Sequence, residues 1–150
     1  MRIVLLALFA VAMAFVESAV VVYLRGLFYP EGFYGTLAAI PVFYYGTEVF
    51  REAATIVMLA AVALLAARRG WWERVAYFLF CFGVWDIFYY VWLYALLGWP
   101  PSLLTNDLLF LIPVPWVAPV AAPVAASAVM IAASVWMLAG RTRSLFEGTE

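Results

Sequence analysis

Long apolar segments, separated by short polar or turn-rich stretches, dominate the chain. Four of them approach the ~20 residues that an α-helix needs to cross a bilayer. They predict spanning helices over residues 3–25, 48–67, 75–98 and 120–139. Because these spans use most of the chain, we expect an all-α fold: a single integral membrane domain over residues 1–150, built as a bundle of four transmembrane helices.

The first apolar segment also has features of a signal peptide. A basic start precedes an apolar core, and Ala12-Met13-Ala14 fits a cleavage site. We nevertheless expect this segment to be retained as the first spanning helix. The second span follows residues 26–46, an aromatic and turn-rich stretch typical of a bilayer interface, and Thr47 fits the N-cap position of that span.

Proline interrupts the segment that leads into the last span. Leu108 to Ala139 carry no charge, and one helix of that length would measure about 48 Å, against ~30 Å for the hydrocarbon core. A straight helix is prevented by Pro113, Pro115, Pro119 and Pro123. We therefore expect "NDLLFLIPVPWVAP" to form a short helical or re-entrant piece, which is stable at membrane depth only when buried in protein or lining a wet cavity.

Composition and charge support a membrane class and predict an orientation. The chain is 69% hydrophobic and 11% charged, with a mean hydropathy of +1.07, outside the range of soluble domains. With the N-terminus in the cytoplasm, six arginines lie on the inner side: Arg2, Arg68, Arg69, Arg74, Arg141 and Arg143. Only Arg25 and Arg51 then lie outside, so we expect a multi-pass protein of the cell inner (plasma) membrane with both termini cytoplasmic.

Residue types that are missing from the chain exclude several chemistries. There is no His and no Lys, and Cys81 is the one cysteine. This excludes a Cys/His zinc site, haem ligation through His, a Ser-His triad and a Schiff base to retinal or pyridoxal phosphate. The net charge of −1 gives no reason to expect nucleic acid as a partner. The remaining chemistry belongs to carboxylates, arginines, tyrosines and the backbone.

The acidic residues concentrate in the half of the bundle that we predict to be outer. Six of the nine acids fall there: Glu17, Glu31, Glu48, Glu52, Asp86 and Asp107. The predicted inner half carries almost nothing polar. An ionised carboxylate that faces lipid at the bilayer centre costs ~2.5–3.5 kcal/mol. We therefore expect the two deep acids to face inward, Glu17 paired with Arg25 or Arg51, and Asp86 with a tyrosine hydroxyl.

Helical spacing groups these residues into stripes. Glu48, Arg51, Glu52 and Thr55 follow an i, i+3, i+4, i+7 pattern, and Gly83, Asp86, Tyr90 and Tyr94 share one face of the third span. The predicted ligand-binding residues are Glu17, Arg25, Glu48, Arg51, Glu52, Asp86, Tyr90 and Asp107. A simpler interpretation of Glu48 and Asp107 is that each favours a helix N-terminus.

Three functions fit this site. Excess carboxylate favours binding of a cation, a proton or a small polar ligand, and a hard divalent cation could take oxygen ligands from Glu17, Glu48, Glu52 and Asp86. Alternatively, an enzyme acting on a lipid or isoprenoid would use Glu17 or Asp86 as its general acid.

The third function is that of an accessory subunit of a larger membrane complex. The last span is rich in alanine at Ala121, Ala125, Ala128 and Ala132. This spacing permits close helix packing, within the chain or between copies in a homo-oligomer. In every case the lipid bilayer is the expected surrounding.

Overall fold

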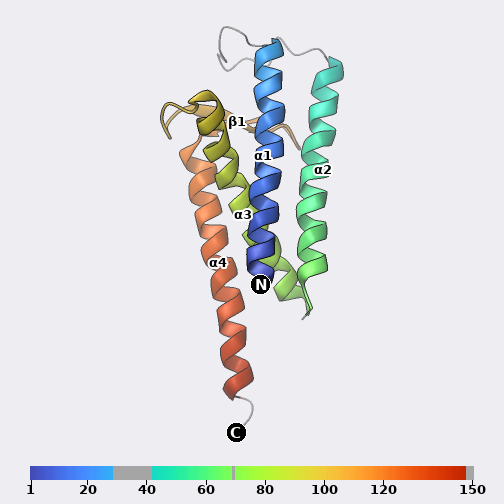
Figure 1. The fold of residues 1–150 in the computed structure, drawn as a ribbon, viewed down its shortest axis with the longest axis vertical. Coiled ribbons are helices and arrows are strands. Elements are labelled where there is room, and N and C mark those ends of the chain that lie inside the picture. The colour runs from blue at the N-terminus through green and yellow to red at the C-terminus, as the bar shows by residue number, and fades with distance from the viewer. Residues whose placement is uncertain (29–41, 69, 148–150) are drawn as a thin grey trace.

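The computed structural model describes residues 1–28, 42–68 and 70–147, with side chains up to Gly140 (Figure 1). Its elements are helices α1 (Arg2–Phe28), α2 (Val42–Ala66), α3 (Gly70–Leu97) and α4 (Ala121–Glu147), and strands β1 (Asn106–Phe110) and β2 (Trp116–Pro119). α1, α2, α3 and residues Ala121–Gly140 of α4 are long and apolar enough to cross a membrane. The prediction of four such helices is therefore confirmed.

The helices alternate in direction, so α1 begins and α4 ends at the same end of the bundle (Figure 1). We call this the terminal end, and the opposite end, which carries β1 and β2, the hairpin end. α3 is the central helix and packs against α1, α2 and α4. In Figure 1, α2 and α4 lie on opposite sides of α1, and α3 passes behind it.

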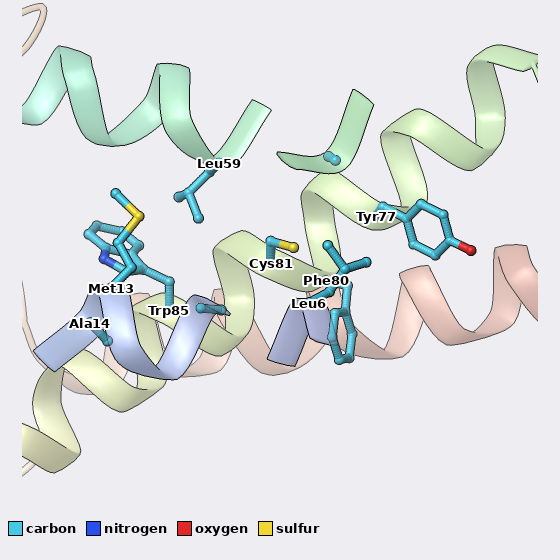
Figure 2. Close-up of a cluster of buried hydrophobic side chains, with 10 residues drawn as sticks. Leu6, Met13, Ala14, Leu59, Tyr77, Phe80, Cys81 and Trp85 are labelled. Carbon is cyan, nitrogen blue, oxygen red and sulfur yellow. The ribbon is translucent and has the colours of Figure 1, made fainter. Parts of the chain in front are cut away.

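An apolar core joins α1, α2 and α3 (Figure 2). Its buried side chains are Leu6, Ala10, Met13, Ala14, Leu59, Ala63, Tyr77, Phe80, Cys81 and Trp85. Two polar contacts reinforce the pairing of α1 and α3: Ser18 Oγ donates to the carbonyl of Tyr89 at 3.0 Å, and Trp92 Nε1 donates to that of Val11 at 3.1 Å. Close packing and interhelical hydrogen bonds are the contacts that join these helices, and they are also the contacts that stabilise helix pairs in lipid.

A glycine permits the close approach of α3 to α4. A Cβ placed on Gly83 would lie 2.7 Å from the carbonyl oxygen of Ser127 and 2.8 Å from Cγ1 of Ile131. Ser127 and Ser134 of α4 are buried in this contact. Ala125, Ala128 and Ala132 are exposed instead, so this alanine face points outward and is not buried by the described part of the chain.

Three helix boundaries differ from the predicted spans by five residues or more. One is the start of α3, which lies at Gly70 and not at residue 75. α2 begins at Val42, not at residue 48. Thr47 is therefore not an N-cap, and its Oγ1 donates within α2 to the carbonyl of Phe43 at 3.0 Å. α4 continues past residue 139 to Glu147. The ends of the predicted loop 26–46 are thus helical, and Glu31 lies outside the described residues, in 29–41.

The segment between α3 and α4 folds as a hairpin and not as a short helix. α3 ends where Gly98 adopts a left-handed φ of 63° and its N–H donates to the carbonyl of Tyr94, a common helix C-terminus. β1 and β2 then pair antiparallel, with Leu108 opposite Val117. Pro113 and Pro115 fall in the connection, where they remove no ladder hydrogen bond. The predicted re-entry of this segment into a membrane remains a prediction.

Candidate functional site

A cavity of about 130 Å³ lies at the hairpin end between α1, α2, α3 and β1. All eight residues predicted to bind a ligand line it: Glu17, Arg25, Glu48, Arg51, Glu52, Asp86, Tyr90 and Asp107. Among the side chains that the structure describes, none from α4 lines it. The structure therefore brings the predicted residues together, while their role in binding remains a prediction.

Arg51 organises the side of the cavity formed by α1 and α2. Its guanidinium forms ion pairs with Glu17 and with Glu48, and its Nε donates to Glu48 Oε2 at 2.8 Å. Thr55 Oγ1 donates to Glu17 Oε1 at 2.6 Å. Glu17 and Glu48 are only 5% and 9% exposed. Of the two partners expected for Glu17, Arg51 is the one that pairs with it, because one helical turn places Arg51 and Thr55 opposite the same carboxylate.

Glu48 lies too deep in α2 to be explained by the helix N-terminus. With α2 starting at Val42, it is about 9 Å along the helix axis, whereas the effect of the helix dipole falls off within the first turn. Asp107 lies in β1 and begins no helix. The simpler interpretation of these two acids as helix N-terminal residues is therefore wrong.

Glu52 connects α2 to the chain that leaves β1. Both of its carboxylate oxygens accept from the backbone N–H of Leu111, at 3.1 and 2.9 Å. The bulge between Leu108 and Phe110 interrupts the strand pairing just before this point. The N–H of Leu111 therefore donates to Glu52 instead of to the partner strand. The hairpin is thereby attached to the rim of the cavity.

The two aspartates form the side of the cavity nearer α3 and β1. Ser127 Oγ donates to Asp86 Oδ2 at 2.8 Å, and the Tyr90 hydroxyl donates to Asp107 Oδ2 at 3.1 Å. The expectation of a tyrosine partner for Asp86 is wrong, because the hydroxyl of Tyr90 reaches β1 instead. Tyr94, predicted on the same face, is 63% exposed.

Asp107 holds its proton more tightly than an aspartate in water. Burial raises the pKa of Asp107 to about 6, opposed by the Tyr90 hydrogen bond and by the positive charge of Arg25. Arg25 itself lies with its guanidinium carbon 3.9 Å from the ring centre of Trp99, a cation–π geometry. Trp99 also packs near Tyr90, so it holds Arg25 at the rim of the aspartate side.

Several lining residues were not among those predicted to bind a ligand, although Thr55 was already part of the predicted polar stripe on the second span. They are Val21, Leu24, Tyr45, Thr55, Trp85, Tyr89 and Leu108–Leu111. Trp85 belongs both to the apolar core and to the cavity wall, and its Nε1 has no hydrogen-bond partner among the described residues. Ser127 was also missed, although an isolated hydroxyl in an alanine-rich span was an available signal for a partner of a deep acid.

The four candidate metal ligands do not converge. Within the described part of the chain, no group of three or more acidic, His or Cys side chains is placed to hold a metal ion. Glu17 and Glu48 form ion pairs with Arg51. Glu52 accepts a hydrogen bond from the N–H of Leu111, and Asp86 accepts one from Ser127 Oγ. The geometry thus gives no support to a hard divalent cation held by these acids.

A further buried acid, outside the cavity, lies at the terminal end, where almost nothing polar was expected. Glu73, 8% exposed, accepts from the backbone N–H of Arg68 at 2.8 Å and from the Tyr77 hydroxyl at 3.2 Å. The guanidinium of Arg2 lies 3.8 Å away. Since Glu73 is in the first turn of α3, the helix dipole also favours its charge, and its contacts join the starts of α1 and α3.

The sequence matches no protein-family profile, and no curated protein or solved structure is significantly similar to it.

Proposed function

We propose that the protein is a small multi-pass protein of the cell inner membrane whose cavity binds a cation, a proton or a small polar ligand. The observation that carries this proposal is the cavity lined by side chains from α1, α2, α3 and β1. Five carboxyl groups and only two guanidinium groups face it. A buried excess of carboxylate is relieved by a cation or by protons.

The size of the cavity favours a small ligand over a lipid substrate. Its volume of about 130 Å³ is similar to the roughly 150 Å³ of an engineered protein cavity that binds benzene. A long isoprenoid chain would not fit within it. The alternative of an enzyme that uses Glu17 or Asp86 on a lipid is therefore less well supported.

The orientation we propose places the cavity toward the outer side. Arg2, Arg68 and Arg74 lie at the terminal end, while Arg25 and Arg51 lie at the hairpin end. Under the positive-inside rule the terminal end is then cytoplasmic. The outward alanine face of α4 supports a second candidate function, as a subunit of a homo-oligomer or of a larger membrane complex.

Native mass spectrometry of the protein, released from its own membranes in mild detergent, tests both candidates. We expect the wild type to retain an ion or small molecule that a Glu17→Gln/Asp86→Asn variant loses. Glu73→Gln, at the opposite end of the bundle, is the matched control and should retain it. Whole-number multiples of the chain mass, or additional foreign chains, would favour the subunit candidate.

Protonation needs its own readout, because one proton is not resolved by mass. For that case we expect tryptophan fluorescence to change between about pH 5 and about pH 8 in the wild type and not in the double variant. If the double variant keeps the bound mass and also keeps the pH response of the wild type, the proposed site is refuted.

A further inference from the structure

We infer that the ligand of the cavity is a small organic ammonium ion that also carries a hydrogen-bond acceptor, as an amino alcohol does. The inference rests on the proposed function and names the chemical class that the same cavity would recognise. It is carried by the unequal charge of the two sides of the cavity, by the aromatic wall and by the indole nitrogen of Trp85.

The two sides of the cavity differ in how their carboxylates are neutralised. On one side Arg51 pairs with Glu17 and with Glu48. On the other side Asp86 and Asp107 accept hydrogen bonds from neutral hydroxyls. Among the described residues, neither aspartate lies within 4.0 Å of a guanidinium nitrogen. Arg25 lies at the rim of this side, and its single charge offsets only part of the charge of the two carboxylates. A bound cation would therefore still be attracted to the aspartate side.

The wall beside these aspartates is aromatic. Ring centres lie 5.1 Å apart for Tyr89 and Tyr90, 6.3 Å for Trp85 and Tyr89, and 6.4 Å for Trp85 and Phe110. Aromatic faces attract ammonium groups, and tryptophan does so best. A metal ion would instead need several converging oxygen ligands, which the described residues do not provide. The combination of carboxylate and aromatic ring thus favours an organic cation.

Trp85 adds an independent requirement for an acceptor. Its side chain is buried, with 6% of the residue exposed, and it lines the cavity. Its Nε1 has no hydrogen-bond partner among the described residues. This nitrogen has almost no accessible surface, so it lies just behind the cavity wall. A buried donor left without a partner is unfavourable, and a small turn of the indole ring toward the ligand would let an oxygen atom on the bound ammonium ion accept from it.

Isothermal titration calorimetry in detergent at pH 7 tests the inference with three probes of equal size. These are 3-hydroxypropylammonium, butylammonium, which lacks the acceptor, and propane-1,3-diol, which lacks the charge. We expect 3-hydroxypropylammonium to bind most tightly, butylammonium several-fold more weakly, and the diol not at all. Equal binding of the diol would overturn charge recognition, and equal binding of butylammonium would overturn the requirement for an acceptor.

Variants locate the binding. Asp86→Asn should weaken binding of 3-hydroxypropylammonium about tenfold or more. If this variant folds poorly, the same loss of affinity is measured in Asp107→Asn. Trp85→Phe should remove the preference for 3-hydroxypropylammonium over butylammonium. Glu73→Gln should leave the affinity for both probes unchanged. If no probe binds the wild type while the double variant described above still loses a retained ion or its pH response, this inference fails and the proposed function stands. If both sets of experiments are negative, both fail.

Discussion

The ion pairs of Arg51 allow a quantitative test of the site. Replacing Arg51 by Met keeps an unbranched apolar stem and removes the charge that faces Glu17 and Glu48. Removing one partner of a buried ion pair typically costs 3–5 kcal/mol, because the other charge stays buried without compensation. Since the side chain of Arg51 is 23% exposed, water can enter, and we expect the lower end, a loss of about 3 kcal/mol in the free energy of unfolding.

The same reasoning predicts that the loss depends on the two acids. In a Glu17→Gln/Glu48→Gln background neither ion-pair partner of Arg51 carries a charge, and Arg51→Met should then cost less than about 1 kcal/mol. Unfolding in mixed micelles, followed by far-UV circular dichroism, measures all four proteins. An equal cost of Arg51→Met in both backgrounds would refute the ion-pair argument and indicate that Arg51 acts through packing alone.

Three further predictions concern packing, titration and the hairpin. Gly83→Ala should lower the free energy of unfolding by about 2 kcal/mol, because its Cβ would meet the backbone of α4. A Cβ on Gly46, in α2, would meet no other atom within 4 Å, so Gly46→Ala should instead raise the free energy of unfolding by about 0.5–1 kcal/mol. Thermal unfolding in detergent measures both variants, and changes of the same sign would contradict this prediction. Burial raises the pKa of Asp107 from 3.8 to about 6, so the folded state binds this proton more tightly and stability should fall as pH rises from about 4 to about 6. The fall should reach about 3 kcal/mol and be absent in Asp107→Asn; an unchanged pH profile in that variant would show that other groups cause it. Glu52→Ala removes the acceptor of the Leu111 N–H and should speed hydrogen exchange in residues 106–119 about 10-fold or more, whereas exchange at the wild-type rate would show that other contacts hold the hairpin.

Much of the fold was predictable because apolar length alone selects spanning helices. The number, order and approximate limits of the four helices followed from runs of apolar residues bounded by charges or turns. The start of α2 did not, since residues 42–47 are aromatic enough to suit either an interface or a helix. The hairpin was missed because the prolines argued only against a long helix. They did not distinguish a short helix from two strands joined at Pro113 and Pro115.

The sequence indicated which acidic and basic residues would lie near one another, but not which donor would bind each acid. The cost of a carboxylate at membrane depth indicates that Glu17 and Asp86 face inward, and helical spacing adds the stripe on α2. Which donor meets which acid depends on the approach of helices that are far apart in sequence. The partner of Asp86 depends on Gly83, whose missing side chain lets Ser127 come close enough to donate.

The pairing of each deep acid with the helix that follows it bears on how the chain would be made. Glu17 of α1 finds Arg51 and Thr55 on α2, and Asp86 of α3 finds Ser127 on α4. If the helices of the membrane protein proposed above entered the bilayer one at a time, in the order of synthesis, each carboxylate would reach the bilayer before its partner. An ionised carboxylate in that position would cost ~2.5–3.5 kcal/mol. The helices would therefore enter the bilayer as two helix pairs, α1 with α2 and α3 with α4. Each pair contains both the deep acid and the side chain that binds it.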